Sequence, residues 1–500
     1  MGKKGKRIWG WVLGFFVLTA FSLDVSAEEG YTYNYDVWGE VQYSPDAYRV
    51  AEVVTAKTLG LEEGFSYPEG LYVSGNRVFL CDTGNNRILE LERTGVGSLE
   101  LKREIKSFQG GSGGNTFSGP TDVAVSEDGF LYISDKNNNR ILKLDEKLNY
   151  VMEFTKPDDV TFDQSMSFLP SKIAVDSAGR VYCTATNVNK GLIKYEADGQ
   201  FSGFVGASEV TYDWVDYLWK QIATKEQRAQ MESFVPTEYV NLYMDGKGFI
   251  YVCTTNVSEN DLKSGKAKPV RRLNMMGSDI LVRNGTDYVI GDQLFDEGGG
   301  YSGPSLFVDV AAMENNTYVC LDRNRGRLFV YDSQGRMLFA FGGNGNADGY
   351  FRLPAAIEHM GHDLLVLDSQ DCSITLFTPT QYGSLVYQAI EEFQAGSYTA
   401  SGDTWREVLA LNGNYDQAYI GIGTSLLRQE KYHEAMDYFR LKWDADNYSN
   451  AFKQYRKEWV EEHIILIIGF LFLVLCVPLA IGRIKAIKHE IDIADIFRGH

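Results

Sequence analysis

The chain has 500 residues, which exceeds one ordinary domain of about 100–200 residues unless the chain is built from repeats. It is 44% hydrophobic, which is enough for a packed core, and its formal net charge is −19. Such a surface repels phosphate backbones and argues against a nucleic acid as a partner. With 50 Gly and only 11 Pro, the composition is typical of tight turns between short strands.

The N-terminus has the pattern of a secretory signal peptide. Four cations within residues 3–7 precede an apolar run, and residues 25–27 are Val, Ser and Ala, which are small enough for cleavage. We therefore predict a signal peptide over residues 1–27. An uncleaved anchor is the alternative.

Six similar segments follow. Each begins with a Pro, continues as an alternating strand, turns at small polar residues and enters a second strand. The anchoring prolines are Pro68, Pro120, Pro170, Pro236, Pro304 and Pro354. Period-2 strands separated by turns at such spacing are typical of a β-propeller, with one four-stranded blade per repeat. The sequence therefore predicts a mainly β fold with six blades.

The repeats resemble the NHL repeat. The second copy carries the best match, "GPTDVAVSEDGFLYISDKNNNRI", and the resemblance extends over about residues 60–380. It implies an NHL-like β-propeller, assigned to residues 28–380, and implies little about activity, because one propeller fold hosts many functions.

"CDTGNNRILELE" at 81–92 recurs as "SDKNNNRILKLD" at 134–145. We expect Asp82 and Asp135 to accept hydrogen bonds from amides of their own hairpins, as in Asx turns. Arg87 and Arg140 should then lie near a fixed carboxylate, and a neighbouring blade is one possible origin of that carboxylate. An Asp and Arg pattern that is repeated in each copy indicates a structural role rather than a catalytic one.

The ring must also close. Blade six is expected to have strands near 353–360, 362–368 and 373–378, after which the chain leaves the propeller. Residues 47–60 form a spare strand before blade one. We predict that this segment pairs as the outer strand of blade six and covers its exposed edge.

After Thr380 the apolar period becomes helical, and residues 384–460 resemble tetratricopeptide repeats. Gly423 and Ala435 fall where paired helices approach each other closely. Two copies are fewer than a stable solenoid usually needs, so the pair is expected to pack on the propeller, on the helix that follows or on a partner. We predict that the partner is a membrane protein that binds through this segment.

Residues 464–482 contain 19 residues without a charge, enough to cross a bilayer as a helix. Arg483, Lys485 and Lys488 follow and place the tail, residues 483–500, in the cytoplasm. The sequence thus predicts a single-pass protein of the cell membrane with its N-terminal ectodomain outside. A buried core helix is the alternative.

Catalytic signatures are sparse. All six His lie at or after His359, which argues against a zinc site built from imidazoles of several blades. Cys81, Cys253 and Cys320 lie at similar points of their repeats and are expected to be small buried fillers too far apart for disulfides. No cofactor and no metal site is predicted.

A ligand site is expected on the face that carries the long connections between blades. The residues two positions after the anchoring prolines are Gly70, Asp122, Lys172, Glu238, Leu306 and Ala356. Three of them are charged and should lie near the channel axis, beside a connection that contains Trp214 and Trp219. We predict that Asp122, Lys172, Glu238, Trp214 and Trp219 bind a polar solute, carbohydrate or short peptide. Charges at the start of exposed strands, and aromatic residues that only attach a helix to the ring, are the alternatives.

These patterns favour a non-catalytic, membrane-anchored binding or scaffold protein outside the cytoplasm. The alternative is a lactonase- or lyase-like propeller enzyme that uses a divalent metal held by carboxylates and Asn.

Overall fold

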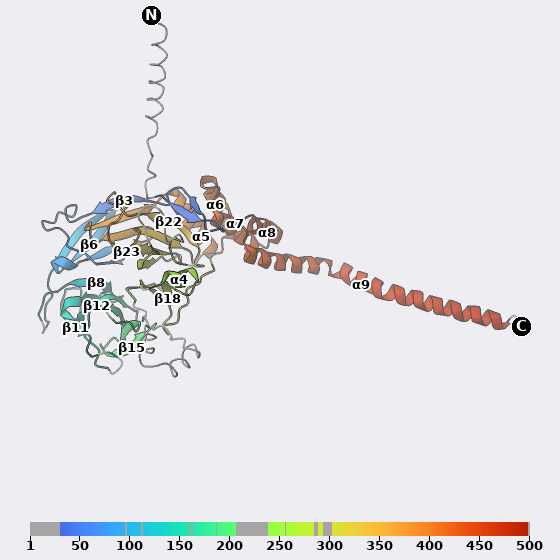
Figure 1. Ribbon diagram of the computed structural model, residues 1–500, viewed down its shortest axis with the longest axis horizontal. Coiled ribbons are helices and arrows are strands. Elements are labelled where there is room, and N and C mark those ends of the chain that lie inside the picture. Colours follow the sequence, from blue (N-terminus) through green and yellow to red (C-terminus); the bar gives the residue numbers. More distant parts are fainter. Residues whose placement is uncertain are drawn as a thin grey trace, which may run out of the picture. The chain divides into compact units, whose positions relative to one another are not determined.

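The computed structural model describes residues 31–498 except 96–97, 112–113, 160–161, 163, 187, 207–238, 256, 285–288 and 294–302. The predicted signal peptide lies outside the described residues. The chain divides into two compact units, Met1–Ser384 and Leu385–His500. The first contains the β-strands and the second is helical (Figure 1).

The first unit is a six-bladed β-propeller, as the sequence predicted. Its first three blades are four-stranded antiparallel sheets. Blade one contains β4 (Gly70–Ser74), β5 (Arg77–Asp82), β6 (Arg87–Gly95) and β7 (Ser98–Ile105). Blade two contains β8 (Pro120–Val125), β9 (Leu131–Asp135), β10 (Arg140–Leu144) and β11 (Tyr150–Phe154). Blade three contains β12 (Pro170–Val175), β13 (Val181–Ala185), β14 (Leu192–Tyr195) and β15 (Phe201–Val205).

The other blades vary this pattern. Blade four has three strands within the described residues: β16 (Asn241–Met244), β17 (Ile250–Cys253) and β18 (Val270–Leu273). Blade five contains β19 (Phe307–Ala312), β20 (Tyr318–Asp322), β21 (Arg327–Tyr331) and β22 (Met337–Gly342). Blade six contains β23 (Pro354–Met360), β24 (Asp363–Asp368) and β25 (Ser373–Pro379).

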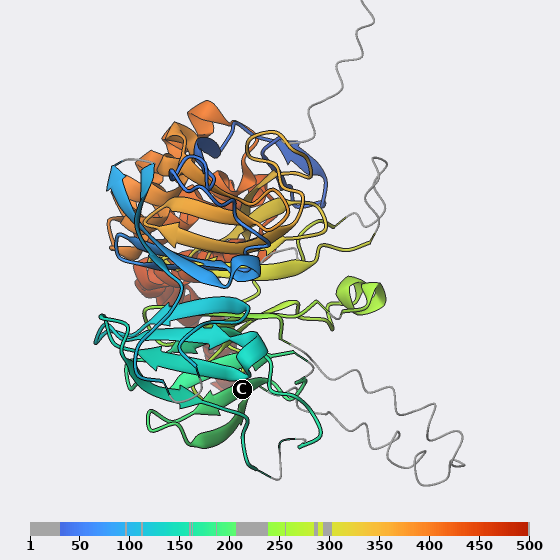
Figure 2. The same cartoon turned by 90° about the vertical axis from the view of Figure 1, so that its left-hand side faces the viewer.

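The first strand of each blade lines the channel. β4, β8, β12, β16, β19 and β23 each contact the next of these strands, and β23 contacts β4 to complete the circle. The second strands are packed on both faces by neighbouring blades, so that every residue of β9, β13 and β20 is buried. Figure 2 shows the blades from a second direction.

The ring closes as the sequence predicted. β3 (Tyr48–Val54) pairs antiparallel with β25, with Val54 opposite Ile374 and Tyr48 opposite Pro379, and becomes the outer strand of blade six. Apolar side chains of blades one and six share one core, which includes Leu80, Leu89, Leu365 and Leu376. The N-terminal segment thus joins the first and last repeats.

A second N-terminal addition was not predicted. β1 (Tyr33–Tyr35) pairs with β22 and with β2 (Val41–Tyr43), so blade five becomes a six-stranded sheet. The buried carboxylate of Asp292 holds this hairpin: it accepts the hydroxyls of Tyr33 and Tyr35, the latter at 2.9 Å. It also pairs with Arg327 at 2.6 Å.

The repeated hairpins have a structural role, with corrections of detail. Arg87 pairs with Asp82 at 2.6 Å and Arg140 with Asp135 at 2.9 Å, so the carboxylate comes from the same hairpin and not from a neighbouring blade. Asp82 and Asp135 also accept a loop amide and the side-chain amide of an Asn. The prediction that they bind backbone amides of their own hairpins is wrong for these two blades. Asp368 of blade six, by contrast, accepts the amides of residues 370 and 371 of its own hairpin.

The second unit is a succession of helices. They are α5 (Gln381–Gln394, which begins in the first unit), α6 (Tyr398–Leu411), α7 (Asp416–Arg428), α8 (Tyr432–Leu441) and α9 (Ala445–Arg498). Consecutive helices from α6 to α9 pack on each other. Ala435 is fully buried, and a Cβ at Gly423 would lie 2.6 Å from the Phe439 ring, so both positions lie at a close approach between α7 and α8.

α9 is one continuous helix that includes residues 464–482, the predicted membrane span. It contains Pro478 and, among the described residues, is the one helix long and apolar enough to cross a membrane. Its apolar side chains from Ile464 onward are mostly exposed, including Ile465 at 81% and Leu466 at 70%. This helix is compatible with a single-pass membrane anchor.

Candidate functional site

The polar side chains in the channel come mainly from one register position of the first, or inner, strand of each blade. Together they are called the polar layer. In blades one, two, five and six, Gly70, Asp122, Asp309 and Ala356 lie opposite the residue that precedes the hairpin Asp. Asn241 faces Cys253 in blade four as Gly70 faces Cys81 in blade one. In blade three Lys172 occupies this position, and its amide donates to Thr184 at 3.1 Å.

The prediction that the residue two positions after each anchoring Pro lies near the channel axis therefore needs a correction in blades four and five. The structure places Asp309, not Leu306, on the channel in blade five, because the strand begins three residues later relative to its Pro. The corresponding position of blade four is Asn241, likewise three residues beyond the predicted Glu238. Glu238, Trp214 and Trp219 lie outside the described residues.

Asp122 and Lys172 are brought together, as predicted, but they are buried rather than exposed at strand starts. Their side chains form an ion pair at 3.9 Å, and they are 6% and 9% exposed as residues. The Asp122 carboxylate also accepts the amide of Ile173 at 2.8 Å, and the Lys172 ammonium donates to the carbonyl of Glu69 at 3.1 Å. Asp122 thus connects the neighbouring blades two and three, and Lys172 connects blade three to blade two and also to Glu69, which directly precedes β4 of blade one.

Asp309 and Glu358 complete the layer and were missed by the sequence argument. Asp309 accepts the amide of Ile357 at 2.8 Å, which repeats the bond from Ile173 to Asp122, and also accepts the side-chain amide of Asn241. Glu358 lies two residues beyond Ala356 on β23, so it points to the same side of the strand. A search for charges at i+2 along each inner strand would have found it.

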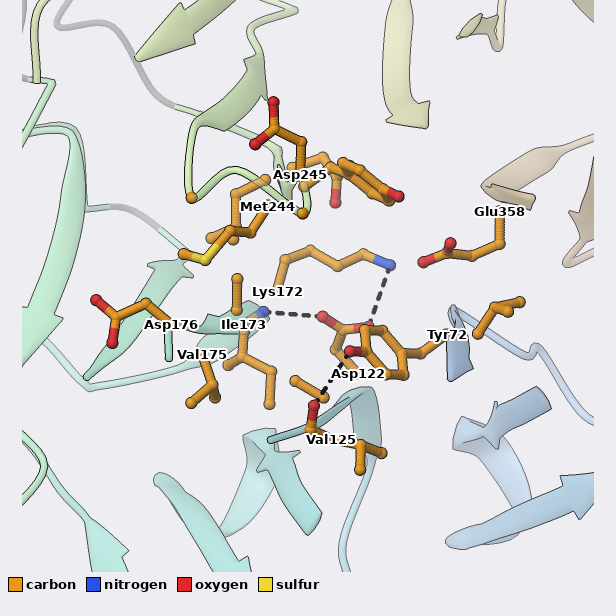
Figure 3. A pocket seen from close by; sticks show the side chains of 18 of the residues that line it. Tyr72, Asp122, Val125, Lys172, Ile173, Val175, Asp176, Met244, Asp245 and Glu358 are labelled. Carbon is orange, nitrogen blue, oxygen red and sulfur yellow. Dashed lines mark hydrogen bonds and ion pairs between the residues drawn. The ribbon is translucent and has the colours of Figure 1, made fainter. Parts of the chain in front are cut away.

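Two cavities lie along the channel. The larger, of about 620 Å³, is bounded by the tight turns between first and second strands, including Glu127, Ser177 and Gly248. Asp122, Lys172, Asp309 and Glu358 lie at its base, and the Lys172 ammonium points between Asp122 and Glu358 (Figure 3). The site was expected on the opposite face; this cavity lies on the tight-turn face.

The second cavity, of about 420 Å³, lies on the face of the blade connections. Its lining includes Tyr67, Glu69, Lys172, Tyr239 and Arg323. Lys172 lines both cavities, whereas Asp122 lines the larger one only. The polar layer therefore lies between the two cavities.

Burial shifts the ionisation of the layer. It raises the pKa of Asp122 to about 6 and that of Asp309 to about 7, and it raises the pKa of Glu358 above its usual range. Burial also disfavours the charged form of Lys172, but the Asp122 and Asp309 carboxylates outweigh this effect and the pKa of Lys172 is raised. The carboxyl groups of Asp122 and Asp309 therefore exchange protons near neutral pH.

Among the described residues, no group of three or more His, Cys, Asp or Glu side chains has an arrangement that could hold a metal ion. His359 lies 3.0 Å from the Tyr243 hydroxyl, and burial lowers the pKa of this imidazole. The described cysteines are free, and Cys81, Cys183, Cys253 and Cys320 are buried.

Comparison with known proteins supports the fold. The family model of the NHL repeat matches residues 65–91 and 117–144, which lie in blades one and two. No curated protein sequence matches the chain. The chain therefore contains NHL repeats within a six-bladed propeller.

Similar solved structures include the virginiamycin B lyase from Staphylococcus aureus, at 12% identity and a TM-score of 0.37, covering 66% of this chain and 99% of that one. The RRP9 WD40 repeats match at 11% and 0.40, covering 67% and 99%. A structural genomics protein of unknown function from Bacteroides thetaiotaomicron matches at 11% and 0.39, covering 70% and 76%. Likenesses this remote imply nothing about the activity of this chain.

Proposed function

We propose that this protein is a membrane-anchored binding protein whose propeller, outside the cytoplasm, takes a small polar ligand in its channel. The observation that carries the proposal is the 620 Å³ cavity with four buried charged residues at its base. Ligand sites are typically concave, of about 300–1,000 Å³, with a few fixed polar groups. Hydrogen bonds to blade three and to blade one hold Asp122 and Lys172, respectively, in place, so this site is pre-formed.

The membrane anchor is α9, with the propeller outside and the residues after 482 in the cytoplasm. Its apolar length and the cations that follow it support this orientation. The helical unit is proposed to bind a membrane protein that transmits the bound state.

The face of the blade connections is proposed as a second contact surface. Glu238, Trp214 and Trp219 would lie there, beside the cavity lined by Lys172, and would cover a carbohydrate or a short peptide. Tryptophan rings stack on sugar rings and on peptide bonds alike.

A ligand screen tests the channel. Full-length protein in detergent is melted with single sugars, amino acids, amines and organic acids, beside a Val175→Trp variant. Val175 lines the cavity and is half-buried, so Trp fills space there with little disturbance of the core. At least one compound should raise the melting temperature of the wild type and not that of the variant. If no compound does so, or if the variant responds equally, the channel is not the binding site.

The partner is tested by co-purification from detergent extracts. Ala435→Trp should overpack the contact between α7 and α8, cost about 1–3 kcal/mol and reduce recovery of the partner, while the propeller's own melting stays unchanged. Glu434→Trp is the matched control, because the neighbouring side chain is exposed. Equal recovery with both variants would contradict a docking role of the helical unit.

A further inference from the structure

The charges at the base of the larger cavity do not balance. Among the described residues that line this cavity, Asp122, Asp309 and Glu358 share one buried cation, Lys172, and Arg323 acts on Asp309 from the lining of the second cavity. At the rim, by contrast, Asp176 pairs with Arg180 at 2.7 Å and Asp245 with Arg272 at 2.6 Å. The excess negative charge is therefore confined to the base, where water is least able to screen it.

Glu358 is the least compensated of these groups. It is 7% exposed, and no side chain among the described residues forms a hydrogen bond or an ion pair with it, the amide of His359 being its polar neighbour. Its carboxylate points into the cavity toward Lys172 (Figure 3). A buried carboxylate without a counter-charge costs free energy of folding unless a cationic ligand or a proton neutralises it.

Two tyrosine rings border the same space. The Tyr72 hydroxyl donates to the carbonyl of Val125 at 3.3 Å, and the Tyr243 hydroxyl lies 3.3 Å from the carbonyl of Ala312. Both residues line the cavity and come from opposite sides of the ring, β4 and β16. Fixed aromatic faces beside carboxylates are the combination that attracts alkylammonium groups.

We propose that the channel cavity binds a small organic cation, with its ammonium group held by Glu358 and Asp309 between Tyr72 and Tyr243. This inference rests on the proposed function and names the class of its ligand. Lys172 neutralises Asp122, and the ligand supplies positive charge to Glu358 and Asp309, for which no ion pair is found among the described residues.

Binding should release protons. Asp309 is partly protonated near neutral pH, since burial raises its pKa to about 7, and burial also raises the pKa of Glu358 above its usual range. A cation favours the ionised carboxylates, so affinity should rise as pH increases from 6 to 8. The titratable and charged groups that face them are Tyr72, Asp122, Lys172, Tyr243, Cys253, Cys320, Arg323 and His359.

Three four-carbon probes of matched length test the charge preference. 1,4-Diaminobutane, 1,4-butanediol and succinate are titrated calorimetrically into the full-length protein in detergent, at several pH values and in two buffers of different ionisation enthalpy. The diamine should bind, release protons and bind more tightly at pH 8 than at pH 6. The diol and the dianion should bind at least about tenfold more weakly, because they lose the charge-assisted bonds.

Glu358→Gln keeps the shape of the side chain and removes its charge. It should lower the affinity for the diamine by about tenfold to a hundredfold. Glu127→Gln is the control: it removes a carboxylate from the exposed rim of the same cavity and should change affinity less than about twofold. The wild-type probe series decides the question even if the Gln variant fails to fold.

Equal binding of diamine and diol, or full affinity in a folded Glu358→Gln variant, would overturn the proposal. Tighter binding of succinate or the diol, abolished by Val175→Trp, would overturn the cation assignment while the proposed function stands. If none of the three probes binds and the wider ligand screen also fails, both are wrong.

Discussion

At the scale of single residues, the same charged residue types serve two purposes in this propeller. In the hairpins, Arg87 and Arg140 satisfy carboxylates of their own blade and hold the loop that enters it. In the channel, Asp122 and Asp309 accept an amide of the next blade while one face of the layer remains open to a cavity. Hairpin charges are therefore fully enclosed by the protein, and channel charges are available to a ligand.

The Arg87 cluster should be essential for stability. Arg87 is 1% exposed and pairs with Asp82 and with Glu104, each at 2.6 Å. Arg87→Ala would leave Asp82 buried without its counter-charge and should lower the free energy of unfolding by about 3–5 kcal/mol. Lys102→Ala, which removes an exposed pair with Glu92 at 3.3 Å, should cost at most about 1 kcal/mol. Comparable losses in denaturant titrations of the two variants would contradict this reading.

The channel acids predict how stability depends on pH. Because the pKa of folded Asp309 is about 7 and its ordinary value is 3.8, the folded state binds more protons than the unfolded state between these values. Stability from this group is fully present below pH about 4 and is lost as pH rises toward 7. Asp309→Asn should therefore melt higher relative to the wild type at pH 8 than at pH 5. A constant difference in melting temperature from pH 5 to 8 would show that Asp309 does not titrate in this range.

At the scale of elements, two N-terminal segments complete sheets that begin about 300 residues later. β3 supplies the outer strand of blade six, and β1 and β2 extend blade five. β3 pairs with β25 along its whole length, so it joins the first and last repeats by backbone hydrogen bonds. The hairpin of β1 and β2 attaches to β22 through one residue pair, Tyr33 with Ala340, and through the Asp292 cluster.

Two nested deletions separate these contributions. Removing residues 31–43 takes away β1 and β2, and removing residues 31–60 also takes away β3. The second deletion should melt at least about 4 °C below the first, because loss of a ring-closing strand costs several kcal/mol and each kcal/mol shifts a large domain by about 2–4 °C. Melting temperatures within about 2 °C of each other would mean that β3 does not hold the ring closed.

At the scale of the whole molecule, one chain combines an acidic propeller with a helical unit whose last helix is apolar enough to span a bilayer. Each unit has its own packed core, so ligand binding and anchoring can be altered separately by mutation. The orientation across the membrane follows from charges that flank the apolar segment rather than from the fold.

Protease accessibility tests the orientation. Protease added to intact cells should degrade the propeller and spare a tag placed after His500, because Arg483, Lys485 and Lys488 hold that end in the cytoplasm. Permeabilised cells are the control, in which the tag should also be cleaved. Cleavage of the tag in intact cells would reverse the proposed topology.

The sequence by itself determined the blades, because each repeat carries its own strand periodicity and turn residues. It also determined the outer strand of blade six, because the spare strand before blade one must pair somewhere. It also brought Asp122 and Lys172 together, since both follow an anchoring Pro by two residues. Only the tertiary structure placed Asn241 and Asp309 on the channel, because the first strands of blades four and five, β16 and β19, begin later relative to their prolines. Likewise, Glu358 is buried because of the blades that meet around the channel, and the contacts of Asp292 with Tyr35 and Arg327 depend on the strands that meet at the outer edge of blade five. Local periodicity contains no information about such contacts.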